Sequence, residues 1–456
     1  MNHHPQQIIR DFTQGDVRRQ LIAFSLPLFL SHLLQIAYNM ADMVIIGQVM
    51  GKVGLSAISV GGDIYSCITF VAMGFANAGQ ILLSQFIGAG KRDQLGRFMA
   101  TIFTFFLGFA LTVSIAGLFF LEEILQLMNT PPEAYAEALA YARVSLAGIV
   151  FIDMYNAVSA VLRGMGDAKH PFYFIGFAAL LNIVLDLVFV PLLGMGAGGA
   201  ALATVLSQGL SCGLGFAFLL RHRGEYHLTL SPRLFFTWDR QLMGLLVSLG
   251  FPMALKNASV QLTKMFVNAW INAFGVAVSA FAGIGHKLNS ALNMLSNSVN
   301  TAGASMIGQN IGAGKYGRVR RIMAETFKFM SVLACLFAAA VYFFPDQIFG
   351  LFTADPEVLR IGREYVPIAI LLALGCDTRS GSNALLNGSG NPHINLAVAL
   401  LDGIVLRLGF SIFFGFYCHM GYFGLWLGDA VAGFTPFVIC LFFYRSGAWK
   451  KAAVHR

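Results

Sequence analysis

A long internal duplication divides this chain. The heptapeptide QFIGAGK that begins at Gln85 returns as QNIGAGK at Gln309, 224 residues later, and GMGD at Gly164 returns at the same distance as GSGN at Gly388. A repeat unit of this length is too long for a solenoid and indicates a duplicated lobe. In an apolar chain, two related lobes predict a transporter whose site lies between or within the halves.

The composition requires lipid as the solvent for much of the surface. Hydrophobic residues make up 57% of the 456 residues and charged residues only 11%, whereas about 25% are charged in a typical soluble domain. Apolar segments of about 20 residues, enough to cross roughly 30 Å of hydrocarbon, recur along the whole chain. Because runs this long and continuous cross lipid as helices, we predict an all-α integral membrane protein with twelve transmembrane helices in two pseudo-symmetric lobes of six. The expected spans lie approximately at 21–47, 54–84, 95–120, 136–162, 171–193, 198–220, 240–273, 277–306, 319–344, 359–386, 393–417 and 422–444.

The basic residues indicate the orientation. With the N-terminus inside, 20 of the 30 Lys and Arg residues fall on the inner ends and loops of the expected spans. The positive-inside rule then places both termini in the cytoplasm. The net charge of +8 is thus explained by topology, and we expect no nucleic-acid partner.

The expected lobes cover residues 1–221 and 239–456, and a polar cytoplasmic loop at 222–238 joins them. Six spans in each lobe give both lobes the same orientation, related by an axis along the membrane normal. One chain then suffices as a functional monomer. Pro27 and Pro252 occupy equivalent positions in the first span of each lobe. A proline inside a helix kinks it, so Pro27 is either a static kink or a hinge for alternating access.

No enzyme motif is present. The GAGK segments lack the first glycine of a phosphate-binding loop and the Ser or Thr that follows its lysine; Gln85 and Arg92 occupy these positions in the first copy. HExxH does not occur in the chain, and the single GxSxG match, GLSCG at 209–213, lies in the middle of the expected span at 198–220 and not at the strand-to-helix turn that this motif requires. We therefore expect a protein that is not an enzyme and that has no cofactor.

Acidic residues inside the spans of the first lobe carry the functional signal. A charge at the bilayer centre costs roughly 2.5–3.5 kcal/mol on insertion scales, so such residues are functional by default. Asn182 and Asp186 are four residues apart and share a helix face. Carboxylates among amide and hydroxyl oxygens, without a fixed cation, predict a site for H⁺ or Na⁺. The alternative is that the acids are protonated, hydrogen-bonded structural groups. The acids are Asp42, Asp63, Asp153 and Asp186, and the neutral polar residues on the same helices are Asn156, Asn182 and Thr204.

The second lobe does not copy this cluster. Its intramembrane ionisable residues are Lys256, Lys264, Lys287, Asp377, Arg379, Asp402, Arg407 and Asp429. Lys256 and Lys264 are eight residues apart and lie roughly on one helix face, and Asp377 is the repeat partner of Asp153. Two interpretations remain: salt bridges that hold the lobe together, or contacts with a polar or anionic part of a substrate. The asymmetry suggests that ion coupling resides in the first lobe.

Several motifs resemble one known family. DFTQG at 11–15, YNMAD at 38–42, LRGMGD at 162–167, NIVLD at 182–186 and GQNIGAG at 308–314 are similar to motifs of the MATE (multidrug and toxic compound extrusion) family. The resemblance covers nearly the whole chain. It implies a multidrug-type exporter of organic, often cationic amphipathic compounds, driven by inward flow of Na⁺ or H⁺.

The resemblance also implies a set of coupling residues. In the prokaryotic branch with an acidic first lobe, the cation site matches Asp42, Asn156, Asn182, Asp186 and Thr204, the first four of which would hold Na⁺. Other branches use acids in the seventh and tenth spans. Here the seventh span carries Lys256 and Lys264 and no acid, while the tenth keeps Asp377. This departure leaves open any coupling role of the second lobe and also whether the substrates are purely cationic.

We therefore predict an inner-membrane antiporter that works by alternating access of its lobes, with small organic molecules and the lipid bilayer as its partners. The polar residues that we expect to meet substrate are Asp153, Lys256, Lys264, Lys287, Asp377 and Arg407. The principal alternative is a flippase or specialised exporter of an anionic or lipid-linked metabolite. A channel or passive receptor is a third hypothesis, which predicts no uphill transport.

Overall fold

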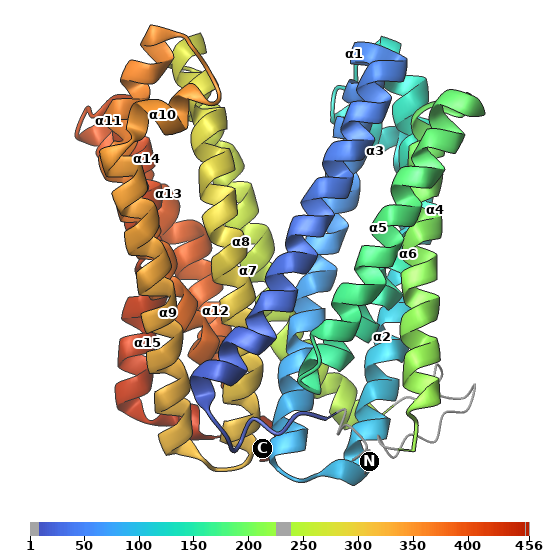
Figure 1. The fold of residues 1–456 in the computed structure, drawn as a ribbon, viewed down its shortest axis with the longest axis vertical. Helices are drawn as coiled ribbons and strands as arrows, with labels where there is room; N and C mark the ends of the chain where they lie inside the picture. The colour runs from blue at the N-terminus through green and yellow to red at the C-terminus, as the bar shows by residue number, and fades with distance from the viewer. Residues whose placement is uncertain (1–8, 225–238, 452, 456) are drawn as a thin grey trace, which may run out of the picture. The chain divides into compact units, whose positions relative to one another are not determined.

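The computed structural model describes residues 9–224, 239–451 and 453–455, and in these residues every regular element is helical (Figure 1). The chain forms two compact units. The first contains residues 1–10 and 26–247, and the second contains residues 11–25 and 248–456. The expected loop at 222–238 lies, from residue 225 onward, outside the described residues.

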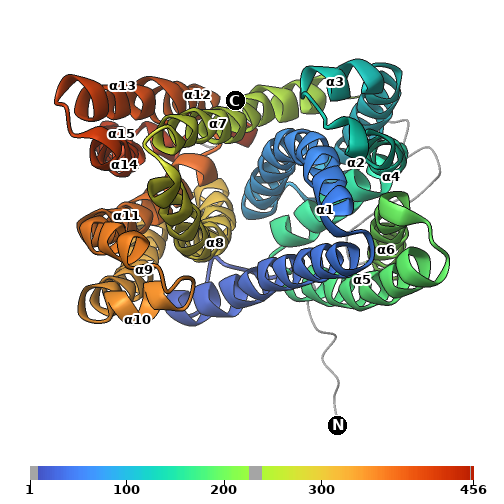
Figure 2. The ribbon, with the colours of Figure 1, turned by 90° about the horizontal axis from the view of Figure 1, so that it is seen from above.

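Long helices build the first unit, in which α4 packs against α2 and α6, and α5 packs against α6 (Figure 2). They are α1 (Val17–Gly88), α2 (Arg92–Phe119), α3 (Leu121–Leu127), α4 (Pro132–Gly164), α5 (Lys169–Leu187) with the π-helical turn η1 (Val188–Leu192), and α6 (Gly196–Arg221). The first nine residues of α1 belong to the second unit.

The 72-residue element α1 is two helices joined by a kink at Gly51, where φ is 61° and ψ is −145°. Such a conformation is strained for residues with a Cβ atom and is open to glycine. Figure 1 shows the chain running to one end of the molecule and turning back there. The two arms correspond to the first two expected spans.

The second unit repeats this plan with more interruptions. In it α11 packs against α8 and α9, and α13 against α14. Its elements are α7 (Arg240–Asn272), α8 (Val276–Gly312), α9 (Tyr316–Phe343), α10 (Pro345–Gly350), α11 (Pro356–Gly388), α12 (Pro392–Leu400), η3 (Leu401–Val405), α13 (Leu406–Ile412), η4 (Phe413–Tyr417), α14 (Gly421–Ala432), α15 (Thr435–Ser446), η5 (Ala448–Lys450) and η6 (Ala453–His455).

These elements account for twelve membrane-crossing helices. Among the described residues, nine helical segments are both long and apolar enough to cross a membrane, and α1 counts as one of them although it contains two arms. The remaining two are α8, with 37 residues, and α11, with 33 residues, which are long enough to cross but less apolar. The predicted all-α, twelve-helix membrane fold is confirmed.

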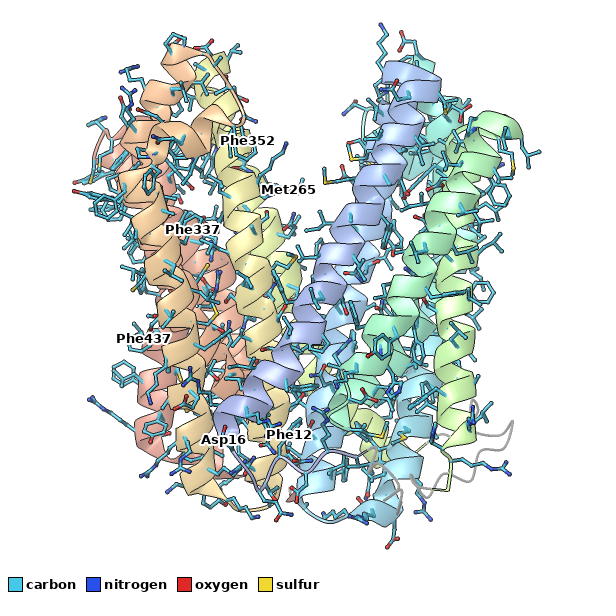
Figure 3. The ribbon with its side chains drawn as sticks, viewed as in Figure 1. Phe12, Asp16, Met265, Phe337, Phe352 and Phe437 are labelled. Carbon is cyan, nitrogen blue, oxygen red and sulfur yellow. The ribbon has the colours of Figure 1, made fainter. Side chains whose placement is uncertain are left out.

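Helix α5 shows how these helices are oriented toward lipid. Phe177, Leu180 and Val184 lie on one face and are 58%, 67% and 57% exposed, whereas Asn182 and Asp186 on the other face are 2% and 0% exposed. The apolar residues of α5 thus face outward and its polar residues face inward, which is the reverse of the arrangement in a helix of a soluble protein. The same outward placement is visible for Phe437 on α15 (Figure 3).

The first helix of each half crosses from one unit to the other. Helix α1 leaves the second unit between Ser25 and Leu26, and α7 leaves the first unit between Val247 and Ser248. Both crossings lie shortly before a proline. Ser25 precedes Pro27 of α1 by two residues, and Val247 precedes Pro252 of α7 by five. Residues 1–221 are predicted to form one lobe, and within this range residues 11–25 group with the second unit.

Candidate functional site

Two carboxyl groups meet inside the first unit. Asp42 of α1 and Asp186 of α5 interact through their side chains. Neither oxygen of Asp186, nor Oδ1 of Asp42, has a well-formed hydrogen bond with any described residue. A buried carboxylate without a partner is costly. The pair is therefore suited to hold a proton or a bound cation.

Neutral oxygen ligands lie on the adjoining helices. Asn182, one turn before Asp186 on α5, donates from Nδ2 to Oγ1 of Thr204 on α6 at 3.4 Å. This bond leaves the buried Oδ1 of Asn182 without a hydrogen-bond donor among the described residues. The arrangement presents acceptor oxygens, which suit Na⁺ or a protonated carboxyl.

Asp153 and Asn156 lie beside each other on α4. Asp153 is 0% exposed, and Asn156 approaches it without completing a hydrogen bond of ordinary geometry. Tyr65 of α1 is an electrostatic neighbour of Asp153. Asn156 therefore stands beside Asp153, while Asp42 and Asp186 contact each other. Asp63, the last of the four acids predicted within the spans of this half, is exposed.

Two tyrosines that sequence analysis did not select stand beside the acid pair. Tyr38 interacts electrostatically with Asp42, and Tyr141 of α4 interacts with both Asp42 and Asp186. A phenol can donate a hydrogen bond to a carboxylate. Tyr38 precedes Asp42 by four residues, and this spacing could have identified it. Nothing in the local sequence pointed to Tyr141.

The predicted hinge residue Pro27 lies within the continuous first arm of α1. The hydroxyl group of Ser31 donates to the carbonyl oxygen of Pro27 at 2.8 Å, inside the same helix. Side-chain bonds of this kind slightly loosen and bend helices. Proline and serine thus both weaken the helix where α1 enters the first unit.

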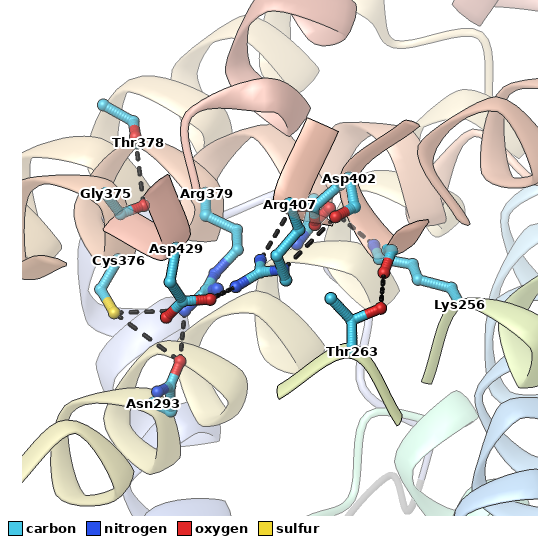
Figure 4. Close-up of polar contacts among 12 residues, drawn as sticks. Lys256, Thr263, Asn293, Gly375, Cys376, Thr378, Arg379, Asp402, Arg407 and Asp429 are labelled. Carbon is cyan, nitrogen blue, oxygen red and sulfur yellow. Dashed lines mark hydrogen bonds and ion pairs between the residues drawn. The ribbon is translucent and has the colours of Figure 1, made fainter. Parts of the chain in front are cut away.

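In the second unit, a buried arginine binds two acids (Figure 4). Arg407 of α13 donates from Nη2 to Asp402 at 2.9 Å and from Nη1 to Asp429 of α14. Its Nε also donates to the carbonyl oxygen of Asp402 at 3.3 Å, and the arginine is 1% exposed. The salt-bridge interpretation therefore holds for Arg407, whose guanidinium is occupied by protein groups.

The lysines of α7 are held differently. Lys256 donates to Oδ1 of Asn383 on α11 at 2.8 Å, which is a neutral partner. Lys264 has Asp429, Arg407 and Arg379 as electrostatic neighbours, but no acid of the described chain lies within the 4 Å of an ion pair. Both lysines therefore lack a direct acidic partner.

The other candidates in this half are Lys287, Asp377 and Arg379. Lys287 on α8 is exposed. Asp377 of α11 accepts a hydrogen bond from Ser331 of α9 at 2.7 Å. Arg379 donates to Oδ1 of Asn293 and, at 3.2 Å, to Sγ of Cys376 (Figure 4). Among the described residues, no group of three or more His, Cys, Asp and Glu side chains gathers as a metal site would require.

A cleft lies beside Lys264 in the second unit, and its empty space, counting the open solvent at its mouth, is about 510 Å³. Its polar lining includes Lys264, Asn268, His286, Asn289 and Asp429, and its apolar lining includes Val267, Ile271, Leu372, Tyr365 and Trp426. A smaller space of about 250 Å³ shares Lys264, Asn289, Leu372 and Asp429 with it and reaches Arg379 and Arg407. A concave, partly apolar site with a few convergent polar groups is typical of small-molecule binding.

Comparison with known proteins gives a family. The model of the MatE family matches the chain twice, at residues 27–188 and 252–413, which agrees with the internal duplication. The chain is 31% identical to the probable multidrug resistance protein YpnP of Bacillus subtilis over 441 residues, covering 96% of this chain and 97% of YpnP. It is 25% identical to the FAD transporter of Shewanella oneidensis, covering 86% and 87%.

Solved structures share the fold. A transporter from Pyrococcus furiosus, described as a member of the MOP superfamily with reversed polarity of the binding pocket, superposes with a TM-score of 0.87 at 22% identity, covering 99% of this chain and all of that one. A MATE protein in a bent conformation gives a TM-score of 0.87 at 23% identity, covering 97% and 98%.

Proposed function

The chain belongs to the MatE family of membrane transporters, and we propose that it is a secondary active antiporter that exports organic compounds in exchange for H⁺ or Na⁺. One observation carries the proposal: Asp42 and Asp186 meet inside the first unit with unsatisfied buried oxygens. A site that holds a proton or Na⁺ in one conformation and releases it in another is what coupling to a gradient requires.

The proposed cycle assigns a role to each group. H⁺ or Na⁺ enters at Asp42 and Asp186, with Asn182, Thr204 and Asn156 as supporting ligands. Neutralising the acids removes the cost of keeping them away from water. A change of bend near Pro27, where α1 crosses between units, would link this occupancy to alternating access. The ion is cargo in this scheme, and no resident cofactor takes part.

The distribution of Lys and Arg supports a position in the cytoplasmic membrane with both termini inside. A monomer is sufficient, since both lobes are in one chain. The family and the name of YpnP support multidrug-type, often cationic amphipathic substrates. A second candidate is export or flipping of an anionic or lipid-linked metabolite. It is supported by Lys264, which lacks an acid within ion-pair distance, and by the name of the related FAD transporter.

The test is transport of a fluorescent cationic dye in proteoliposomes under an imposed Na⁺ gradient, an imposed pH gradient, or no gradient. Wild type and Asp42→Asn are compared, with Asp63→Asn as the matched control, because Asp63 is an exposed acid on the same element. We expect one gradient to drive uphill transport in wild type and Asp63→Asn, and transport to be lost in Asp42→Asn. Full gradient-driven transport by Asp42→Asn would overturn the coupling assignment.

A further inference from the structure

We propose that the cleft of the second unit binds an organic anion, with its acidic head at Lys264 and its apolar or aromatic body against Trp426 and Tyr365. The inference rests on the proposed exporter function and names a substrate class for it. The chemistry is that of a carboxylate, sulfonate or phosphate on an apolar body.

The charges around the cleft are unbalanced. The cations are Lys256, Lys264, Arg379 and Arg407, and the carboxylates close to them are Asp402 and Asp429. Both carboxylates already bind Arg407. Lys256 and Arg379 are held by the neutral amides of Asn383 and Asn293. Asp377 of α11 accepts a hydrogen bond from Ser331. The four cations therefore outnumber the two carboxylates by two, and a bound anion would compensate this excess of positive charge.

The donors point to the same chemistry. The Oδ1 atom of Asn289 accepts a hydrogen bond from Nδ2 of Asn293 at 2.8 Å. This bond fixes the orientation of the amide, so that Asn289 has its N–H groups to offer. Asn289 and Lys264 line both the larger cleft and the smaller space beside it. A ligand head placed there meets an ammonium group and an amide donor, which suits an anion.

Aromatic rings supply the other half of the site. Tyr365 and Trp426 line the larger cleft with ring centroids 4.9 Å apart, and Phe281 packs against both at 5.2 Å and 5.9 Å. The rings hold one another in place, so a ligand that packs on them loses little additional freedom. Val267 and Ile271 extend this apolar wall. The cleft thus favours an amphipathic anion over a small inorganic one.

An organic cation in this cleft would be surrounded by side chains of its own charge. It would face Lys264, Arg379 and Arg407, and the carboxylate of Asp429 is already engaged by Arg407. Like charges at close range repel each other, which lowers the affinity for a cation. The cleft should therefore discriminate against the charge type expected of general multidrug substrates.

The test is isothermal titration calorimetry of the full chain in phosphatidylcholine nanodiscs. The probes share one ring and differ in charge: 2-naphthoate, neutral 2-naphthamide and 2-naphthylmethylammonium. Three variants are compared with wild type. Lys264→Met removes the charge, Lys264→Arg keeps it, and Lys328→Met is the matched control because Lys328 is an exposed lysine of the same unit outside the cleft.

We expect wild type to bind naphthoate about tenfold or more tightly than naphthylmethylammonium, and Lys264→Met to lose about tenfold or more of the naphthoate affinity. Lys264→Arg should retain most of it, and Lys328→Met all of it. Equal or tighter binding of the ammonium probe would overturn the inference, as would unchanged naphthoate binding by a folded Lys264→Met protein.

A nanodisc that contains phosphatidylglycerol distinguishes two sources of the anion. If this lipid competes with naphthoate at Lys264, the ligand is a lipid headgroup, and if it does not compete, the ligand is a free anion.

Binding without a gradient distinguishes the two proposals. Asp42→Asn should still bind naphthoate, because Asp42 lies in the first unit and the cleft in the second. If binding depends on Lys264 while gradient-driven transport fails, the exporter function is wrong and the anion site stands. If transport depends on Asp42 while Lys264 has no effect on binding, the anion site is wrong and the exporter stands.

Discussion

Nε of Arg318 donates a hydrogen bond to the carbonyl oxygen of Phe12 at 2.7 Å, across 306 residues of sequence. The same guanidinium donates from Nη1 to Gly15 at 2.8 Å and from Nη2 to Gln14 at 2.7 Å. Phe12 is 1% exposed and packs on Phe24. Figure 3 shows Phe12 and Asp16 at the start of α1. One arginine thus fastens the segment before α1 to the second unit.

Replacing Arg318 should release this segment. Arg318→Met removes several charge-assisted bonds, each worth about 1.5–3 kcal/mol when well formed, less at this partly exposed position. We expect a total loss of about 1–3 kcal/mol in unfolding free energy and faster tryptic cleavage after Arg18 and Arg19. Arg321→Met is the control, because Arg321 is an exposed arginine of the same helix. Equal stability and equal cleavage in the two variants would show that the segment does not depend on Arg318.

The segment should also respond to acid through Asp11. Burial opposes ionisation of Asp11, but hydrogen bonds from Thr13 and Gln14 and the nearby charge of Lys315 hold its pKa below the usual value. A lowered folded pKa contributes stability that is present above the unfolded value and is lost as pH falls through the folded one. The difference in Tm between wild type and Asp11→Asn should therefore be constant above about pH 5 and shrink below about pH 4. A difference that persists unchanged to pH 3 would contradict this assignment.

The buried triad around Arg407 should be essential for folding. Arg407→Met leaves Asp402, which is 2% exposed, and the largely buried Asp429 without their cation. Removing one partner of a buried ion pair costs about 3–5 kcal/mol. Thermal unfolding in detergent should show a large loss for Arg407→Met, partly restored when Asp402→Asn and Asp429→Asn are added.

The exposed pair of Arg363 and Asp346 is the comparison for this triad. Nε of Arg363 donates to Asp346 at 2.7 Å, close to the 2.9 Å between Arg407 and Asp402, but both side chains are at least half exposed. Exposed pairs contribute little, so Arg363→Met should leave the Tm almost unchanged. If Arg363→Met lowered the Tm as much as Arg407→Met does, burial would not be what makes the loss of an ion pair costly.

Much of the fold could be predicted because lipid imposes a simple rule. A helix that crosses hydrocarbon must be about 20 residues long and apolar, so the spans at 21–47 and 54–84 were separable around the kink at Gly51 without any knowledge of packing. The shared face of Asn182 and Asp186 followed from helical spacing alone. The functional roles of these residues remain predictions.

Contacts between distant segments could not be predicted in the same way. The placement of residues 11–25 with the second unit depends on Arg318, Asn310 and Gln309, which are about 300 residues away. Asp402 and Arg407 are five residues apart, and two side chains at this spacing do not face each other on an α-helix. The π-helical turn η3 brings them together, and π turns have no reliable sequence signature.

The close crossing of α13 and α14 provides the last prediction. A Cβ atom on Gly428 would lie 2.3 Å from the backbone nitrogen of Ser411, and no side-chain rotation can relieve that contact. Overpacking of this kind typically costs about 1–3 kcal/mol, and Gly428→Ala would also shift α14, which carries Asp429. Gly409→Ala on α13 is the matched control, because its Cβ would meet nothing within 4 Å. We expect Gly428→Ala to lower the Tm and to weaken naphthoate binding, whereas Gly409→Ala should keep wild-type affinity and equal or higher stability. If Gly428→Ala unfolds and binds like wild type, the two helices do not touch as closely as the structure has them.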